Sequence, residues 1–299
     1  MEFALVDVFA DRPLTGNPLA VVADADALPD SVLARVAGEF NQSETTFLMR
    51  PTVAGAAWRL RSFTAAGVEV FGAGHNALGA WWWLAATDRL GAPASGSTWY
   101  QQLGDRVLPV TVTSADGGVT VAMRQAEVRY GETVADTDRL ARALGLRAEE
   151  LGAAPALPVA QVVDTGAPHL LVGCRDRAAV DKARPDAGVL RGLVREVEGE
   201  GVYLYATDPA GNDVDAYARF FNPTAGIAED PATGSAAGPL ACLLHRHGAA
   251  GRLVVVGQGH AMARPSRIRV EVDTAPIITG TATVFASGKL FISGENAEQ

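Results

Sequence analysis

The segment Ala228-Glu229-Asp230-Pro231-Ala232-Thr233-Gly234-Ser235-Ala236-Ala237-Gly238 sets the architecture that we predict for this chain. It is a turn of small and polar residues that leads directly into the apolar stretch 239–244. Small residues let a backbone approach a ligand closely, and Ser235 is a typical N-cap for the helix that we expect next. The first turn of such a helix offers unpaired N–H groups and the positive end of its dipole. The segment therefore predicts a helix start that binds a carboxylate or another anion.

A second segment of the same design, Glu69-Val70-Phe71-Gly72-Ala73-Gly74-His75-Asn76-Ala77-Leu78-Gly79, precedes the apolar stretch 80–86. In both segments a glutamate stands five positions before the glycine that opens the helix, and His75 and Ser235 then occupy matching positions. Two helix starts of this kind in one chain indicate a duplicated fold, with the site between its halves.

The sequence around the two segments repeats as well. Gly16-Asn17-Pro18 resembles Gly166-Ala167-Pro168, and Arg61-Ser62-Phe63 resembles Arg219-Phe220-Phe221. The number of residues between matching pieces changes along the chain only by amounts that loop insertions explain. Each half therefore consists of several strands, then the glycine turn, then a buried helix.

We predict a duplicated α+β fold with an N-terminal half at 1–124 and a C-terminal half at 125–280. The last strand, near 281–293, is expected to pair back into the first half. Locally, the pattern predicts a helix over 31–40 and a polar turn that holds Glu44. Further predicted elements at the chain's end are strands over 268–272, 278–285 and 289–292.

Composition bounds the classes of protein. The chain has 299 residues, an apolar fraction of 48% and a formal net charge of −9, which argues against nonspecific nucleic-acid binding. Its longest apolar run, 77–86, is about half of what a membrane span needs, and the N-terminus has no export signal. Cys174 and Cys242 lack CxxC spacing, which favours buried thiols in a reducing compartment. We expect a cytoplasmic protein without nucleic-acid or membrane partners.

Four residues are candidates for chemistry, each with a simpler interpretation beside it. Glu44 at the mouth of a site would be a proton-transfer group, or else a solvated loop glutamate. His75 at a helix start would act as a neutral hydrogen-bonding group or acid, or else cap and pack. For Asp230 the simpler interpretation is a cap of its turn, and for Ser235 it is a cap of its helix.

No nucleotide, metal or serine-hydrolase signature is present. Gly72-Ala73-Gly74 and Gly257-Gln258-Gly259 lack the third glycine of a dinucleotide site, and there is no Walker lysine. His245 and His247 point to different faces of a helical stretch and, with His260, are expected in solvent. No Gly-x-Ser-x-Gly elbow occurs. We predict no metal and no cofactor.

At this point the sequence resembles the phenazine-biosynthesis isomerase family, named for trans-2,3-dihydro-3-hydroxyanthranilate isomerase. The resemblance covers nearly the whole chain in the expected order. The matching pieces are Val6-Asp7-Val8-Phe9, Gly16-Asn17-Pro18, Gln42-Ser43-Glu44-Thr45-Thr46-Phe47, Arg61-Ser62-Phe63-Thr64, Glu69 with Gly74-His75, and Glu229-Asp230-Pro231-Ala232-Thr233-Gly234-Ser235-Ala236.

The resemblance implies the diaminopimelate-epimerase-like fold, with two pseudo-symmetric domains that each wrap a curled sheet around a central helix. It also implies a homodimer. Glu44 would transfer the proton, together with His75 and Asp230. The residues that would hold the substrate carboxylate are Ser43, Gly74, Gly234 and Ser235.

Asn76 joins the predicted substrate-binding residues because many members have proline or alanine there, and its amide would point toward the site. The implied activity is a cofactor-independent isomerisation of a small cyclic carboxylic acid in phenazine-type secondary metabolism. One glutamate can remove a ring proton and return it elsewhere on a ring that is held still.

Two other functions stay open at this stage. One is an epimerase or tautomerase of a different amino or hydroxy acid. Relatives that racemise amino acids use two thiols, whereas Ala73 and Ala232 stand at those positions, which disfavours a two-thiol racemase. The other is a noncatalytic carrier of small molecules, which would have no use for Glu44, His75 and Asp230 together.

Overall fold

The computed structural model describes residues 1–91, 96–115, 118–208 and 214–292. The chain divides into two compact units, Met1–Met123 with Gly280–Gln299 (unit 1) and Arg124–Thr279 (unit 2). Each unit contains a sheet with an inner helix, and the other face of the sheet is covered by α1 (Asp30–Phe40) in unit 1 and by α3 (Thr137–Ala143) and α5 (Ala187–Glu196) in unit 2. The predicted duplicated α+β fold is confirmed. None of the helices in the described ranges combines the length and the apolar character that crossing a membrane requires.

The elements of unit 1 are β1 (Glu2–Val8), β2 (Asn17–Val22), α1 (Asp30–Phe40), β3 (Glu44–Met49), β4 (Trp58–Thr64), β5 (Glu69–Val70), α2 (His75–Ala86), β6 (Ser97–Leu103), β7 (Arg106–Ala115), β8 (Gly118–Arg124) and β18 (Ala282–Lys289). The elements of unit 2 are β9 (Arg129–Thr133), α3 (Thr137–Ala143), η1 (Ala148–Glu150), β10 (Ala160–Asp164), β11 (Pro168–Gly173), α4 (Arg177–Lys182), α5 (Ala187–Glu196), β12 (Gly201–Thr207), β13 (Ala216–Asn222), β14 (Ile227–Asp230), α6 (Gly234–Arg246), β15 (Leu253–Gln258), η2 (His260–Met262), β16 (Ser266–Glu271) and β17 (Ile277–Gly280).

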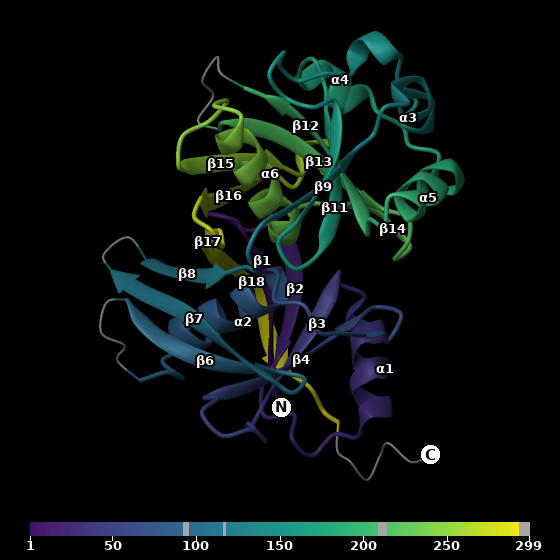
Figure 1. Ribbon diagram of the computed structural model, residues 1–299. Coiled ribbons are helices and arrows are strands. Elements are labelled where there is room, and N and C mark those ends of the chain that lie inside the picture. Colours follow the sequence, from purple (N-terminus) through teal and green to yellow (C-terminus); the bar gives the residue numbers. More distant parts are fainter. Residues whose placement is uncertain (92–95, 116–117, 209–213, 293–299) are drawn as a thin grey trace. The chain divides into compact units, whose positions relative to one another are not determined.

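In unit 1 the strands curl around α2 (Figure 1). The helix packs against β1, β2, β3, β7 and β18, so it is surrounded by apolar strands. This explains why its sequence is apolar on every side, including the tryptophans at 81–83. Helix α1 packs on the opposite face of the same sheet through a cluster that contains Val32, Phe47 and Phe63. The sheet thus has an inner face toward α2 and an outer face toward α1.

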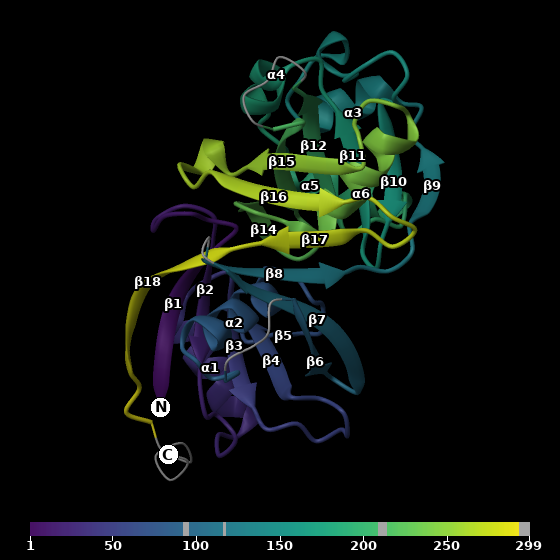
Figure 2. The same cartoon turned by 90° about the vertical axis from the view of Figure 1, so that its left-hand side faces the viewer.

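The C-terminal strand β18 belongs to unit 1. It pairs antiparallel with β1, and Figure 2 shows the yellow strand beside the purple one. The N-terminal amine of Met1 extends this contact by donating to the carbonyl oxygen of Leu290 at 3.0 Å.

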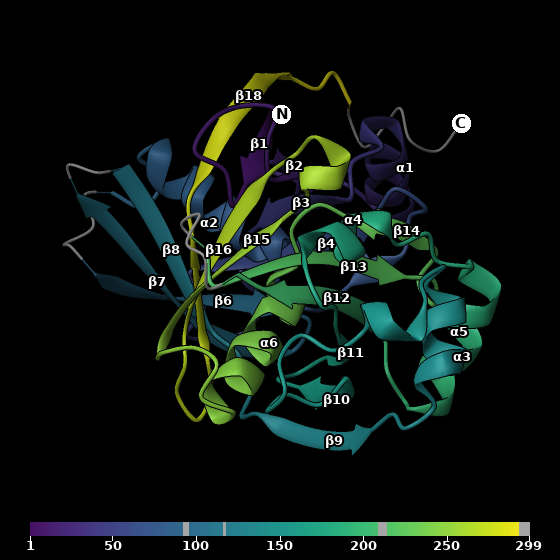
Figure 3. The same ribbon diagram turned by 90° about the horizontal axis from the view of Figure 1, so that it is seen from above.

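Unit 2 repeats the arrangement around α6. This helix packs against β10, β11 and β16, while α3 and α5 lie on the other side of β10–β13 (Figure 3). The outer face carries alternate residues of each strand, such as Leu170, Val202 and Phe221, in one apolar cluster. Since side chains alternate along a strand, the intervening residues face α6.

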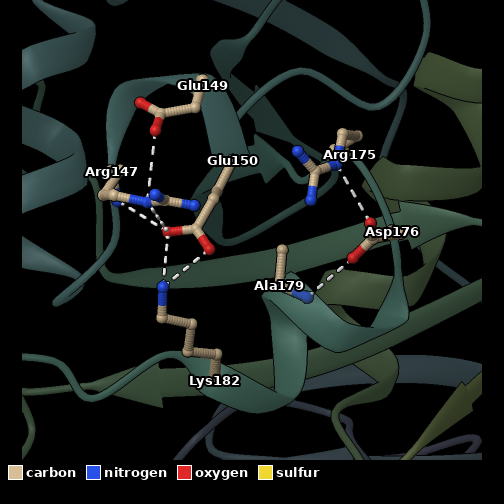
Figure 4. A network of polar contacts seen from close by, with 7 residues as sticks. All are labelled: Arg147, Glu149, Glu150, Arg175, Asp176, Ala179 and Lys182. Atoms are coloured by element: carbon tan, nitrogen blue, oxygen red, sulfur yellow. Dashed lines mark hydrogen bonds and ion pairs between the residues drawn. The ribbon is translucent and has the colours of Figure 1, made fainter.

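A buried carboxylate ties the outer layer of unit 2 together (Figure 4). Glu150 accepts hydrogen bonds from the Nζ of Lys182 at 2.7 Å and from the backbone N–H of Arg147 at 2.9 Å. The Lys182 bond, followed by the Arg147 bond, lowers the pKa of Glu150 to about 2. The charge therefore stays compensated at the junction of η1 and α4.

Several local predictions need correction. Glu44 does not lie in a turn: β3 begins there, because β2 and β4 pair with this polar end of the strand and extend it. The strand predicted over 278–285 is two strands, interrupted at Thr281. The strand predicted over 289–292 is wrong, since β18 ends at Lys289; residue 293 of the predicted range 281–293 lies outside the described residues.

The elements that the sequence did not predict include β9, α4 and α5. β9 and α4 are short, with five and six residues. α5 carries a signal that was overlooked, because Asp186 caps it and its buried residues Leu190, Leu193 and Val194 follow helical spacing.

Candidate functional site

The glycine turn of unit 1 is built by Asn76. Its Oδ1 accepts from the backbone N–H of Gly74 at 2.8 Å, and its Nδ2 donates to the carbonyl oxygen of Gly72 at 3.0 Å. The side chain is buried, so both ends of the amide serve the turn. The expectation that this amide points toward a ligand is not what the structure shows. A contact between Asn76 and a substrate stays a prediction.

The turn leads directly into α2, which begins at His75. The helix's own hydrogen bonds begin with Leu78 N–H to the carbonyl of Gly74, and the N-cap residue Gly74 has no side chain to bond. The backbone N–H groups of His75, Asn76 and Ala77 therefore have no acceptor within the helix. The helix start that the sequence predicted is therefore present, and anion or substrate binding there stays a prediction.

His75 is the first residue of α2. Its Nε2 is buried and makes no hydrogen bond to any residue in the described part of the chain. Burial lowers the pKa of His75 to about 4, so the imidazole is neutral near pH 7. A neutral ring with one uncommitted nitrogen can donate to, or accept from, a bound ligand.

Strand alternation fixes the direction of Glu44. Phe47 and Met49 of β3 belong to the outer cluster with α1, so Glu44, an odd number of residues away from both, is on the inner face. Its neighbour in β2 is Leu19, whose side chain contacts α2 at Gly79. The half-buried carboxylate of Glu44 therefore belongs to the sheet face that packs on α2, and β3 makes contact with that helix.

Ser43 precedes β3 and is exposed. The chain enters it through Asn41, which ends α1 in the left-handed conformation at φ 50°, where asparagine is better tolerated than most residues. Ser43 and Glu44 are thus the last loop residue and the first strand residue of one short connection.

The matching turn in unit 2 depends on a buried amide from another strand. Gln258, at the end of β15, is fully buried. Its Nε2 donates to the carbonyl of Asp230 at 2.7 Å and to the hydroxyl of Thr233 at 3.0 Å. Its Oε1 accepts from the hydroxyl of Tyr203 at 2.8 Å and from the N–H of Thr233 at 3.1 Å. All the hydrogen-bonding groups of the glutamine are used to shape this turn.

Asp230 is held inside the same turn. Its Oδ2 accepts from the hydroxyl of Thr233 at 2.5 Å. The turn ends in α6, whose N-cap is Thr233 and whose first residue is Gly234. The prediction that Ser235 caps this helix is wrong, because Ser235 is already the second helical residue.

Ser235 instead bonds a histidine that the sequence analysis did not single out. Its Oγ lies 3.1 Å from Nε2 of His169, on β11. The carbonyl of the neighbouring Gly234 accepts from Nε2 of Gln125 at 2.9 Å. His169 is the second residue of β11 and Gln258 the last residue of β15, so each is a polar residue at the end of an apolar strand, and that was the signal available in the sequence.

The aligned glutamates of the two segments have a structural function. Glu229 accepts two hydrogen bonds at 2.8 Å from Nε and Nη2 of the buried Arg219. Glu69 accepts two at 2.7 Å from the same atoms of the buried Arg61. Both arginines lie on the outer face of their sheet, and the pKa of each is raised, first by its glutamate. The bridges fix the strand that leads into each glycine turn.

The predicted residues divide between the two units. Glu44 lies on the sheet face that packs against α2, the helix that begins at His75. In the sequence of unit 1, Ser43 is next to Glu44, and Gly74 and Asn76 are next to His75. Asp230, Gly234 and Ser235 form one turn and helix start in unit 2. Among the described residues, no three His, Cys, Asp or Glu side chains are grouped as metal ligands.

Comparisons with known proteins identify the family and the fold. The model of the family described as phenazine biosynthesis-like protein (PhzC-PhzF) matches residues 6–288. The trans-2,3-dihydro-3-hydroxyanthranilate isomerase of Pseudomonas aeruginosa is 32% identical over 299 positions, covering 97% of this chain and 99% of that protein. A solved structure described as a predicted epimerase, also from P. aeruginosa, superposes with a TM-score of 0.82 at 33% identity, covering 98% of this chain and 99% of the other.

A probable proline racemase from Agrobacterium radiobacter superposes with a TM-score of 0.66 at 12% identity, covering 98% of this chain and 93% of the other, which shows the fold alone. The protein therefore has the diaminopimelate-epimerase-like fold of isomerases and epimerases, as the resemblance implied. Within that class, the chain belongs to the phenazine biosynthesis-like protein family.

Proposed function

We propose that this protein isomerises a small cyclic carboxylic acid of the dihydrohydroxyanthranilate type without a cofactor, with Glu44 as the group that moves the proton. The family includes relatives named for this activity, and the chain is similar to one of them over nearly its whole length. The proposal assigns the proton transfer to Glu44 of unit 1.

The observation that supports the proposal most directly is the position of Glu44. A carboxylate begins a buried central strand, on the face that packs against the helix of the glycine turn. Hydrophobic packing alone gives no reason for an ionisable residue at such a position. The neutral His75 at the start of that helix adds a second group able to hydrogen-bond a reacting ring.

The chemistry that we propose uses one base. The carboxylate of Glu44 takes a proton from C3 of the ring, so that the C–H electron pair enters the ring's π-system and the double bonds shift. The carboxylic acid formed on Glu44 then gives a proton to another ring carbon, and the enzyme returns to its starting state. N–H groups at the helix starts would balance the charge that builds on the substrate.

The thiol chemistry of an amino-acid racemase is disfavoured by the state of both cysteines. Ala73 and Ala232 occupy the positions where such relatives carry thiols. Burial raises the pKa of Cys174 to about 12 and that of Cys242 to about 11. Since the thiolate is the reactive form, neither residue is a general base near pH 7.

The test is NMR of trans-2,3-dihydro-3-hydroxyanthranilate in deuterated water with wild-type protein and with Glu44→Gln. We expect the wild type to remove the C3 proton signal, and the variant to do so about a thousandfold more slowly, because a positioned base is worth about this factor. The variant should keep its melting temperature and its affinity for the substrate.

Glu39→Gln is the matched control, since Glu39 is exposed on α1 only five residues away. It should behave as wild type. Equal turnover by wild type and Glu44→Gln would refute the role of Glu44. Tight binding by a wild type that turns over no cyclic amino or hydroxy acid would instead support a carrier on this fold.

A further inference from the structure

The contact between His169 and Ser235 has no counterpart in unit 1. His169 is only 2% exposed, and its ring packs edge-on against Phe220 with centroids 5.1 Å apart. Its Nε2 lies 3.1 Å from Oγ of Ser235, while its Nδ1 is buried without a hydrogen bond to any residue in the described ranges. Burying a polar ring is costly unless it is hydrogen-bonded, and the contact with Ser235 supplies that hydrogen bond to His169.

The sheet register identifies the equivalent positions of the two units. In unit 1, Leu19 of β2 lies beside Glu44 of β3 in a parallel pair. In unit 2, His169 of β11 lies beside Gly201 of β12 in the same kind of pair. His169 therefore stands where unit 1 has leucine, and Gly201 stands where unit 1 has the carboxylate.

The space beside Gly201 is filled. A Cβ placed on this glycine would lie 2.6 Å from the ring of Phe220, the ring that also packs on His169. Unit 2 thus has no room for a second base at the position equivalent to Glu44.

The tautomer of His169 follows from its surroundings. Burial lowers the pKa of His169 to about 4 although Asp164 opposes the shift, so near pH 7 the ring is neutral and carries one N–H. A proton on Nδ1 would be a buried donor without an acceptor, and orphaned buried donors are rarer in proteins than under-used acceptors. The proton therefore belongs on Nε2, and Ser235 Oγ is the acceptor of this bond.

We propose that His169 is a positioning residue: by donating Nε2–H to Oγ of Ser235, it leaves the serine's own proton free to bond a substrate carboxylate at the start of α6. The inference rests on the proposed function, since it takes the carboxylate as the ligand of Ser235. It goes further by assigning the direction of both hydrogen bonds, with the hydroxyl acting as acceptor from His169 and donor to the substrate.

The first test is ¹⁵N NMR of histidine-labelled protein without substrate. We expect the resonances of His169 to show the Nε2–H tautomer and to stay unchanged above about pH 5. A proton on Nδ1, or an imidazolium at pH 7, overturns the proposal. This readout does not depend on turnover, so a wild type that fails to isomerise the substrate refutes the proposed function and not the assignment of the tautomer.

The second test compares the kinetics of His169→Leu, His169→Gln and Ser235→Ala. Leucine is the residue of unit 1 at this position, whereas glutamine keeps a donor near the place of Nε2. We expect His169→Leu to raise KM about tenfold at nearly constant kcat. The lost bond positions Ser235, and the bond from Ser235 to the carboxylate is equally strong in the ground state and the transition state. His169→Gln should restore KM to within about threefold of wild type.

The double variant His169→Leu with Ser235→Ala completes the cycle. Since His169 acts through Ser235, the double variant should have the KM of Ser235→Ala alone. Effects that multiply, or a His169→Gln protein as impaired as His169→Leu with a normal melting temperature, contradict the proposal.

Discussion

The two units of this protein share a framework and differ in the residues that the framework presents. Each has a buried arginine that binds the glutamate five residues before the glycine of its turn (Gly74 or Gly234), and each has a glycine turn that leads into the inner helix. On the inner sheet face, however, unit 1 has Glu44, whereas unit 2 has Gly201 with the ring of Phe220 in the adjoining space. The two copies thus share the arginine–glutamate pair and the glycine turn, and they differ at the sheet position of Glu44 and Gly201.

The turns themselves are held differently. In unit 1 a residue of the helix, Asn76, bonds the turn from within. In unit 2 the amide comes from β15, where Gln258 also binds Tyr203. The two turns thus have independent supports, one from within its own helix and one from a neighbouring strand.

The largest effect should come from breaking the arginine bridge of unit 2. Arg219→Leu leaves Glu229 unpaired and removes the donor to the carbonyls of Val180 and Ala183, so we expect a loss of about 3–5 kcal/mol in unfolding free energy. Arg61→Leu should cost less, because its second partner Asp30 is largely exposed. Urea unfolding of both variants measures the difference; equal losses would contradict this ranking of the two bridges.

A pH-dependent effect should come next. The folded-state pKa of His169 is about 4 against the ordinary 6.5, so between these values the unfolded chain binds a proton that the folded chain does not. The stability that the protein gains from a neutral His169 is therefore complete above pH 6.5. It is lost as the pH falls to 4, which lowers the free energy of unfolding by up to about 3 kcal/mol. His75 in unit 1 should act in the same direction.

Urea unfolding at pH 7 and at pH 4.5 measures this window. His169→Gln should lose less stability between the two pH values than the wild type, since glutamine does not titrate. His245→Gln is the control, as His245 is exposed on α6. If His169→Gln keeps the full pH dependence of the wild type, the buried neutral state of His169 is wrong.

A smaller effect should follow from adding a side chain at Gly201, the position of unit 2 that is equivalent to Glu44. Gly201→Ala places a methyl group against Phe220, and overpacking of this kind costs about 1–3 kcal/mol. Gly192→Ala is the matched change on α5, where nothing lies within 4 Å of the new methyl, and it should stabilise by up to about 1 kcal/mol. Thermal unfolding compares the two. A harmless Gly201→Ala would mean that unit 2 does have room for a side chain there.

Much of the fold was accessible from the sequence. The two glycine segments, the matching Gly-x-Pro and Arg-x-Phe pieces and the all-round apolar helix predicted a duplicated α+β protein, because turns and burial leave local patterns. The segment with Glu44 was misjudged for an equally physical reason. Its polar residues read as a turn, whereas pairing with β2 and β4 makes them the start of a buried strand.

The sequence by itself determined the repeat, the positions of the helix starts and the residues with capacity for proton transfer. These depend on spacing and residue type along the chain. Only the tertiary structure decided that Glu229 and Glu69 bind arginines, that Asn76 and Gln258 shape the turns, and that His169 bonds Ser235. Each of these contacts joins residues from different elements or fixes the direction of a side chain, and a local pattern in one chain carries no information about which distant partner a buried polar group finds.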